Sequence, residues 1–220
     1  MINIELIYKY FPLLLQGAAT TLYIAGLSCT IGLVGGIILA LAQTSGNKIL
    51  SGIVTLYVTI IRGTPMLIQI AFFYYAILPT LGLTISALYA AIIAIGLNST
   101  AYISQVVRSG ITSVSKGQIE AAKTLGLSTW QIIQYIVLPQ ALRVVIPSLG
   151  NEFITLIKDS SLAYTIGVVE LYKQGITMRS LTLDAMTTYT AVALMYLVMT
   201  TTLSIFMNYI ENRMNAHAKN

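Results

Sequence analysis

The chain has 220 residues, and only 9% of them are charged, whereas soluble globular domains carry about 25% charged residues. Hydrophobic residues make up 56% of the chain, and the mean hydropathy is +0.81. This composition excludes an ordinary water-soluble globule, and the 16 glycines and 5 prolines are too few for a collagenous or disordered chain. We therefore expect an all-α protein that crosses a membrane several times.

Long stretches without charge set the expected number of spans, because a helix needs roughly 20 apolar residues to cross about 30 Å of hydrocarbon. Nothing is charged between Arg62 and Arg108, which is enough for two spans separated by a turn at 79–82. The sequence thus predicts a single transmembrane domain over residues 1–220. Its five predicted helices are about 17–42, 56–78, 85–108, 135–158 and 186–210.

Basic residues set the expected orientation. An odd number of spans puts the two termini on opposite sides, and a cytoplasmic C-terminus leaves slightly more lysine and arginine in the cytoplasmic segments. We therefore expect the N-terminus outside and the C-terminus in the cytoplasm. The net charge of +5 does not indicate nucleic acid, because the basic residues are dispersed over the loops.

Polar residues inside the spans are candidates for a solute path, because each is costly in hydrocarbon unless it faces protein, water or a partner. Residues 62–65 interrupt the second span, where Gly63 and Pro65 can break the helix. Residues 98–100 lie near the middle of the third span. The fourth span places Ser148, Glu152, Thr155 and Asp159 on one helix face.

Glu152 allows two interpretations at this stage. In the structural one it is protonated or bonded to a neighbouring helix, and in the functional one, which we slightly favour, it lines a solute path. Arg143 lies nine residues earlier and half a turn out of phase, so it is a poor partner within the same helix.

Gly32 and Gly36 form a Gly-x-x-x-Gly pair in the first span. Small residues at this spacing let helices approach closely in lipid. We expect the pair to pack helices within the chain, and a subunit interface is the alternative.

The longest polar stretch lies between the third and fourth spans. Within it, residues 115–134 predict a short cytoplasmic helix, which Gly126 ends through its permissive backbone. Taken alone, the pattern also fits an interfacial helix that merely lies on the bilayer.

One stretch of this region resembles the cytoplasmic signature of ABC importer permeases. It reads Glu120-Ala121-Ala122, then three residues, Gly126, nine residues, Ile136, one residue and Leu138-Pro139. Residues 62–69 (RGTPMLIQ) and 156–162 (LIKDSSL) resemble segments typical of polar-amino-acid permeases. The resemblance covers nearly the whole chain.

This resemblance implies the type I ABC importer permease fold in a bacterial plasma membrane (cell inner membrane), with a division of labour between subunits. The chain would form the membrane pathway without enzymatic activity or a cofactor of its own, and it lacks a phosphate-binding Gly-x-x-x-x-Gly-Lys-Ser/Thr loop. A separate ATPase dimer would bind ATP and Mg, and an extracytoplasmic binding protein would deliver the amino acid. A second permease copy completes the expected pathway, with a homodimer slightly favoured over a related permease. The implied ATPase-coupling residues are Glu120, Ala121, Ala122 and Gly126.

An amino-acid solute brings a carboxylate, which Arg62 can bind with two parallel hydrogen bonds, and an ammonium group, which Glu152 can neutralise. Two acidic groups on one helix face favour a basic or polar amino acid. The candidate substrate-binding residues are Arg62, Gly63, Thr64, Asn98, Ser99, Thr100, Glu152 and Asp159. The alternative is a secondary transporter or channel that uses Glu152 as an ion or proton site. It predicts no partner ATPase and leaves the signature over 120–139 unexplained.

Overall fold

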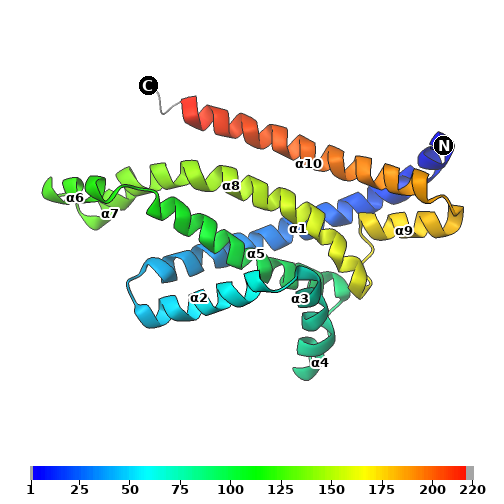
Figure 1. The fold of residues 1–220 in the computed structure, drawn as a ribbon, viewed down its shortest axis with the longest axis horizontal. Coiled ribbons are helices and arrows are strands. Elements are labelled where there is room, and N and C mark those ends of the chain that lie inside the picture. Colours follow the sequence, from blue (N-terminus) through cyan, green and yellow to red (C-terminus); the bar gives the residue numbers. More distant parts are fainter. Residues whose placement is uncertain (1, 217–220) are drawn as a thin grey trace.

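The computed structural model describes residues 2–216, and every regular element in this part of the chain is helical. The α-helices are α1 (Ile4–Thr44), α2 (Lys48–Gly63), α3 (Met66–Phe72), α4 (Leu78–Thr80), α5 (Ala87–Thr112), α6 (Lys116–Thr124), α7 (Thr129–Ile132), α8 (Leu138–Asp159), α9 (Leu171–Thr182) and α10 (Ala185–Ala216). The π-helical turns η1 (Phe73–Ile77) and η2 (Ile133–Val137) and the 3-10 helix η3 (Ser160–Ile166) connect some of them. Figure 1 shows the N-terminus and α9 at one end of the molecule, and α6 and α7 at the other.

The predicted spans correspond to long apolar helices. Four continuous helical stretches within residues 2–216 are long and apolar enough to cross a membrane: Ile4–Thr44, Ala87–Thr112, Thr129–Ile166 and Ala185–Met214. The fifth candidate is a pair of helices, Lys48–Gly63 and Met66–Thr80, with a bend of 106° between them. The predicted second span is therefore not one straight helix, and it breaks where Gly63 and Pro65 were expected to break it.

The first helix begins at Ile4, well before the expected start near residue 17. Asn3 caps it, because its side-chain oxygen accepts a hydrogen bond from the Leu6 amide at 3.2 Å. The Asn3 amide in turn donates to the Thr187 hydroxyl at the start of α10, at 2.9 Å. The charged residues near the N-terminus indicated where the hydrocarbon begins, whereas the helix continues beyond it.

A π-helical turn precedes Pro139, the first of two prolines in the fourth span. In η2 the amide of Leu138 donates to the carbonyl of Ile133, one residue further back than in an α-helix. Because proline lacks an N–H and its ring crowds the preceding turn, this wider turn lets the helix continue through it. The same arrangement, η1, precedes Pro79. The fourth span is therefore continuous from Thr129 to Ile166.

The two glycines of the Gly-x-x-x-Gly pair lie where α1 packs against α5. A Cβ atom built on Gly32 would lie 2.5 Å from the Ser99 hydroxyl, and one on Gly36 would lie 2.6 Å from Cγ2 of Ile103. Such contacts are too short for any residue larger than glycine without a shift of the helices. The interpretation of the pair as packing within the chain is confirmed.

A buried carboxylate, Glu170, holds the helix α9 in place. Its two oxygens accept hydrogen bonds from the amides of Tyr172 and Lys173, both at 2.8 Å, and from the Tyr196 hydroxyl of α10 at 3.0 Å. Burial raises the pKa of Glu170, and these hydrogen bonds oppose that rise. The carboxylate thus caps α9 and ties it to α10.

We expect Gly36→Val to reduce the free energy of unfolding by about 1–3 kcal/mol, because overpacking a close helix contact forces the helices apart. Gly26→Val is the matched control, since no atom lies within 4 Å of a Cβ built on Gly26 of the same helix. Thermal unfolding of the purified protein in detergent measures both variants. Equal stability of the two would show that the α1–α5 contact is not limiting.

Candidate functional site

A polar cavity of about 280 Å³ lies between the end of α2, the second half of α5, and α8. Its lining residues are Arg62, Tyr102, Gln105, Val106, Ser109, Val144, Ser148 and Glu152. The structure therefore brings the predicted residues Arg62 and Glu152 to one cavity, although they are far apart in the sequence. Ser148, from the polar face predicted for the fourth span, joins them.

Arg62 occupies the last turn of α2, immediately before the break in the second span. Its guanidinium carbon lies 5.2 Å from the centroid of the Tyr102 ring, which is within the range of a cation–π interaction. A cation in the last turn of a helix also interacts favourably with the helix dipole. The sequence analysis missed Tyr102, because one tyrosine in an apolar span carries no signal of its own.

Glu152 meets the polar group of the third span. The Ser99 hydroxyl donates a hydrogen bond to Oε1 of Glu152 at 3.1 Å, linking α5 to α8. Glu152 is thus bonded to a neighbouring helix, as the structural interpretation expects, and it also lines the cavity, as the functional one expects. A direct contact with solute stays a prediction.

The break between α2 and α3 is held by Gln69, the last residue of the segment 62–69, whose role here was not predicted. Its amide nitrogen donates to the Ile61 carbonyl and to the Thr64 hydroxyl, both at 2.7 Å. Its amide oxygen accepts a hydrogen bond from the Asn98 side chain at 2.8 Å. Helix ends leave backbone groups unpaired, and Gln69 satisfies part of that demand while fixing α3 to α5. Thr64 and Asn98 therefore belong to this network in the structure.

Three other predicted residues lie apart from the cavity lining. Thr100 is buried and donates to the Gly96 carbonyl within α5 at 2.9 Å. Gly63 is exposed at the end of α2. Asp159 ends α8, about 10 Å along the helix from Glu152 at 1.5 Å per residue.

The predicted cytoplasmic helix is α6, and Gly126 ends it as expected. Gly126 has a φ of +81°, and the Leu127 amide donates to the Ala122 carbonyl at 3.1 Å, which together form a Schellman cap. Glu120 and Ala121 are exposed, whereas Ala122 is buried against the rest of the chain. The two alanines therefore have different neighbours: Ala121 is free to meet a partner, and Ala122 packs internally.

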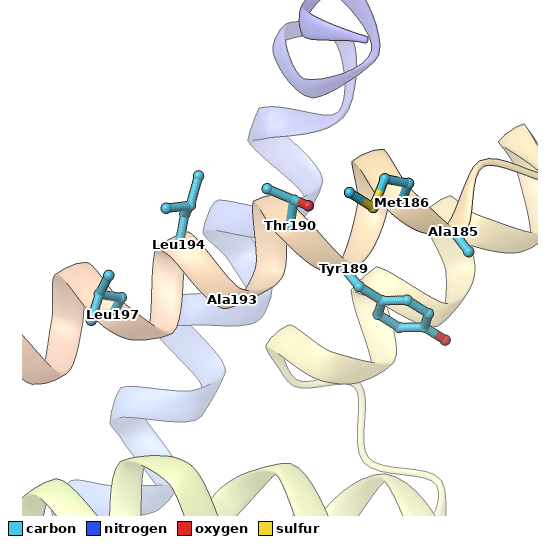
Figure 2. Close-up of a pocket in the computed structure, with 7 residues that line it drawn as sticks. All are labelled: Ala185, Met186, Tyr189, Thr190, Ala193, Leu194 and Leu197. Atoms are coloured by element: carbon cyan, nitrogen blue, oxygen red, sulfur yellow. The ribbon is translucent and has the colours of Figure 1, made fainter. Parts of the chain in front are cut away.

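A larger hollow, of about 650 Å³, lies on the outer face of α10 and has a different character (Figure 2). Figure 2 shows that its lining comes from successive turns of this one helix. The lining residues are Ala185, Met186, Tyr189, Thr190, Ala193, Leu194 and Leu197. A mostly apolar face of a span is what lipid requires, and the hollow shares no residue with the polar cavity.

Comparison with known proteins decides the family. The profile of the "Binding-protein-dependent transport system inner membrane component" family matches residues 32–216. The chain belongs to this family. The permease is 40% identical to the glutamine transport system permease protein GlnP of Escherichia coli K12, over 94% of this chain and 95% of that protein. It is also 39% identical to the probable amino-acid permease protein YxeN of Bacillus subtilis, over 97% of this chain and 96% of that protein.

Solved structures share the fold of the permease. The crystal structure of an amino acid ABC transporter with histidines superposes with a TM-score of 0.90 at 35% identity, covering 97% of this chain and 99% of that one. The MetNI methionine ABC transporter, in an inward-facing conformation, superposes with a TM-score of 0.79 at 23% identity, covering 94% of this chain and 98% of that one. The type I ABC importer permease fold expected from the sequence is confirmed.

The permease is thus the transmembrane subunit of a binding-protein-dependent amino-acid importer. It is not an enzyme, because ATP hydrolysis in such importers belongs to a separate subunit. ATPase and binding-protein partners follow from the family. The alternative of a secondary transporter or channel is rejected.

We expect Gln69→Met to lower the free energy of unfolding by about 1–3 kcal/mol, because it leaves the side-chain amide of Asn98 without its acceptor and removes the shorter hydrogen bond to the Ile61 carbonyl. Methionine keeps the length of the side chain and removes its polar atoms. Gln16→Met is the control, because Gln16 is exposed on α1. Thermal unfolding in detergent compares the variants, and an unchanged midpoint for Gln69→Met would contradict a structural role of this network.

Proposed function

We propose that this permease imports a polar or basic amino acid through the cavity lined by Arg62, Ser148 and Glu152. One observation carries the proposal: a guanidinium and a carboxylate face the same small polar cavity from different helices. An amino acid presents the complementary pair of charges. Arg62 binds the solute carboxylate with two parallel hydrogen bonds, and Glu152 binds the α-ammonium or a cationic side chain.

The other predicted residues take supporting roles in this proposal. Ser99 orients Glu152 through its hydrogen bond. Asn98 and Thr64 act through Gln69, which holds the backbone at the break between α2 and α3. The buried Thr100 supports α5 from within.

Asp159 lies at the end of α8 away from the cytoplasmic segment, so in this proposal it attracts a cationic group near the outer entrance. The names of the relatives agree with a polar solute. The Escherichia coli relative is named for glutamine, and the structure of 35% identity is described with histidines. Together with the two acidic groups on α8, these names favour glutamine, histidine and arginine as the solutes to test first.

Glu152→Gln and Arg62→Gln each remove one charge from the cavity, and we expect each to reduce ATP-driven uptake about 10-fold or more. A hydrogen bond to a charged group contributes about 1.5–3 kcal/mol, which corresponds to about 10- to 100-fold in affinity. Uptake into proteoliposomes and amino acid retained on the purified complex are measured for arginine, histidine and glutamine.

Glu5→Gln and Arg179→Gln are the matched controls, because they remove the same charges from exposed external positions. If both cavity variants assemble and then transport and retain all three amino acids as the parent does, Arg62 and Glu152 do not bind the solute.

We further propose that α6 docks on a separate ATPase dimer that binds ATP and Mg. Glu120 and Ala121 are exposed on α6 and available to a partner. Figure 1 places α6 at the end of the molecule opposite α9 and the N-terminus. With α6 in the cytoplasm of a bacterial cell, the N-terminus and α9 face outside, where the extracytoplasmic binding protein delivers the amino acid.

Assembly with a second permease is part of this proposal, because one chain with five spans is too small to enclose an alternating-access pathway. The outer face of α10 is largely exposed and is open to lipid or to a second permease. We favour two copies of this chain over a pair with a related permease.

Gly126→Leu should uncouple or disassemble the complex while leaving the spans inserted, because only glycine adopts a φ of +81° without strain. Gly46→Leu is a matched control: its φ is +79°, it too has no atom within 4 Å of a built Cβ, and it lies between α1 and α2.

Photo-crosslinkers at Lys116 and Lys123 should capture the ATPase in the parent complex, and native mass spectrometry then counts the permease copies. Absence of any captured ATPase from a complex that transports would refute the docking of α6.

A further inference from the structure

A hydrogen bond between two glutamine side chains joins α6 directly to α8. The amide nitrogen of Gln140 donates to the side-chain oxygen of Gln118 at 2.7 Å. The same nitrogen donates to the Ile136 carbonyl at 2.9 Å, which holds the Gln140 side chain against its own helix. In the part of the chain that the structure describes, no other side-chain hydrogen bond connects α6 with α8.

A cleft of about 390 Å³ separates the two helices at this point. Ala122 of α6 and Ile136 at the start of the fourth span lie on its walls, and Gln118 and Gln140 both belong to its lining. Apolar packing between α6 and the fourth span is therefore interrupted, and the glutamine pair crosses the gap.

The covalent route from α6 to α8 is longer than this bridge. The chain passes through Gly126, whose φ is +81°, then through the short helix α7 and the π-helical turn η2 before it reaches Leu138. The hydrogen bond between Gln118 and Gln140 bypasses these segments. The glutamine pair is therefore the shortest link between α6 and α8 at this point.

We propose that Gln140 is a positioning residue that transmits displacements of α6 to α8 through Gln118. The proposal rests on the proposed docking of α6 on the ATPase. Gln118 lies two residues before the exposed Glu120, on the helix that docks. Gln140 begins the helix that carries Glu152 about 18 Å further along, at 1.5 Å per residue. The pair therefore connects the docking surface with the helix that lines the polar cavity.

The test is the number of amino acids transported per ATP hydrolysed by the complete importer in proteoliposomes. Gln118→Ala and Gln140→Ala should each lower this ratio about five-fold, as the loss of one ordinary hydrogen bond changes an equilibrium. Because both remove the same bond, the double variant should lose no more than either single variant. The combination Gln118→Glu with Gln140→Lys keeps an acceptor and a donor in place and should restore the ratio.

Gln16→Ala is the control, since Gln16 is exposed on α1. Crosslinking from Lys116 and Lys123 is repeated on every variant and should capture the ATPase as in the parent. Unchanged ratios in the single variants, additive losses in the double variant, or a Glu–Lys pair that captures the ATPase without restoring the ratio would each overturn the role of Gln140. Failure of the crosslinkers to capture the ATPase in the unmodified parent complex would instead refute the docking of α6, and this proposal with it.

Discussion

The cost of an unpaired polar group in hydrocarbon governs this structure. Each backbone N–H and C=O inside a bilayer must find a partner within the protein, so the described part of the chain consists of helices. The second span breaks all the same, and Gln69 meets the demand there by donating to the Ile61 carbonyl and the Thr64 hydroxyl. Prolines in two other places follow π-helical turns that keep the helices continuous. The same constraint joins Ser99 to Glu152.

Close packing of α1 on α5 sets the position of the polar residues. Gly32 and Gly36 let the two backbones approach, and α5 then presents Asn98 and Ser99 toward the neighbouring elements. Asn98 bonds Gln69 in the broken second span, and Ser99 bonds Glu152 in α8. The cavity that Arg62 and Glu152 share is therefore a consequence of where α5 lies, and its lining comes from three separate helices.

The molecule has two specialised ends joined by long helices (Figure 1). At one end Glu170 caps α9 and binds α10, and Thr187 binds the N-terminal segment through Asn3. At the other end α6 is attached by a glycine turn and a glutamine pair. A firmly attached end at α9 and a lightly attached α6 suit a subunit that receives movement from a partner at α6, as proposed above.

Much of this architecture was readable from the sequence, because the hydrocarbon demands long apolar segments and tolerates few charges. The spans, the helix break near Pro65, the glycine contact and the end of α6 at Gly126 all follow from local chemistry or from the residue types a close contact requires. The family signature was likewise local, since it occupies one continuous stretch of the chain. The N-terminal extension of α1 to Ile4 was not predicted. Charge spacing marks where the hydrocarbon begins, whereas the first residue of a helix is set by its N-cap, here Asn3.

Only the tertiary structure decided which polar residues meet. Arg62 and Glu152 were both predicted as site residues, but their shared cavity depends on the packing of α2, α5 and α8. Gln69 was noted only as part of the segment 62–69 and Gln140 not at all, because their contacts with Asn98 and Gln118 span 29 and 22 residues of the sequence. Tyr102 likewise became part of the site only when Arg62 lay over its ring. Sequence by itself determined the segments and the family, because both depend on local composition and motif spacing, whereas the side-chain network required the three-dimensional placement of helices that the sequence separates.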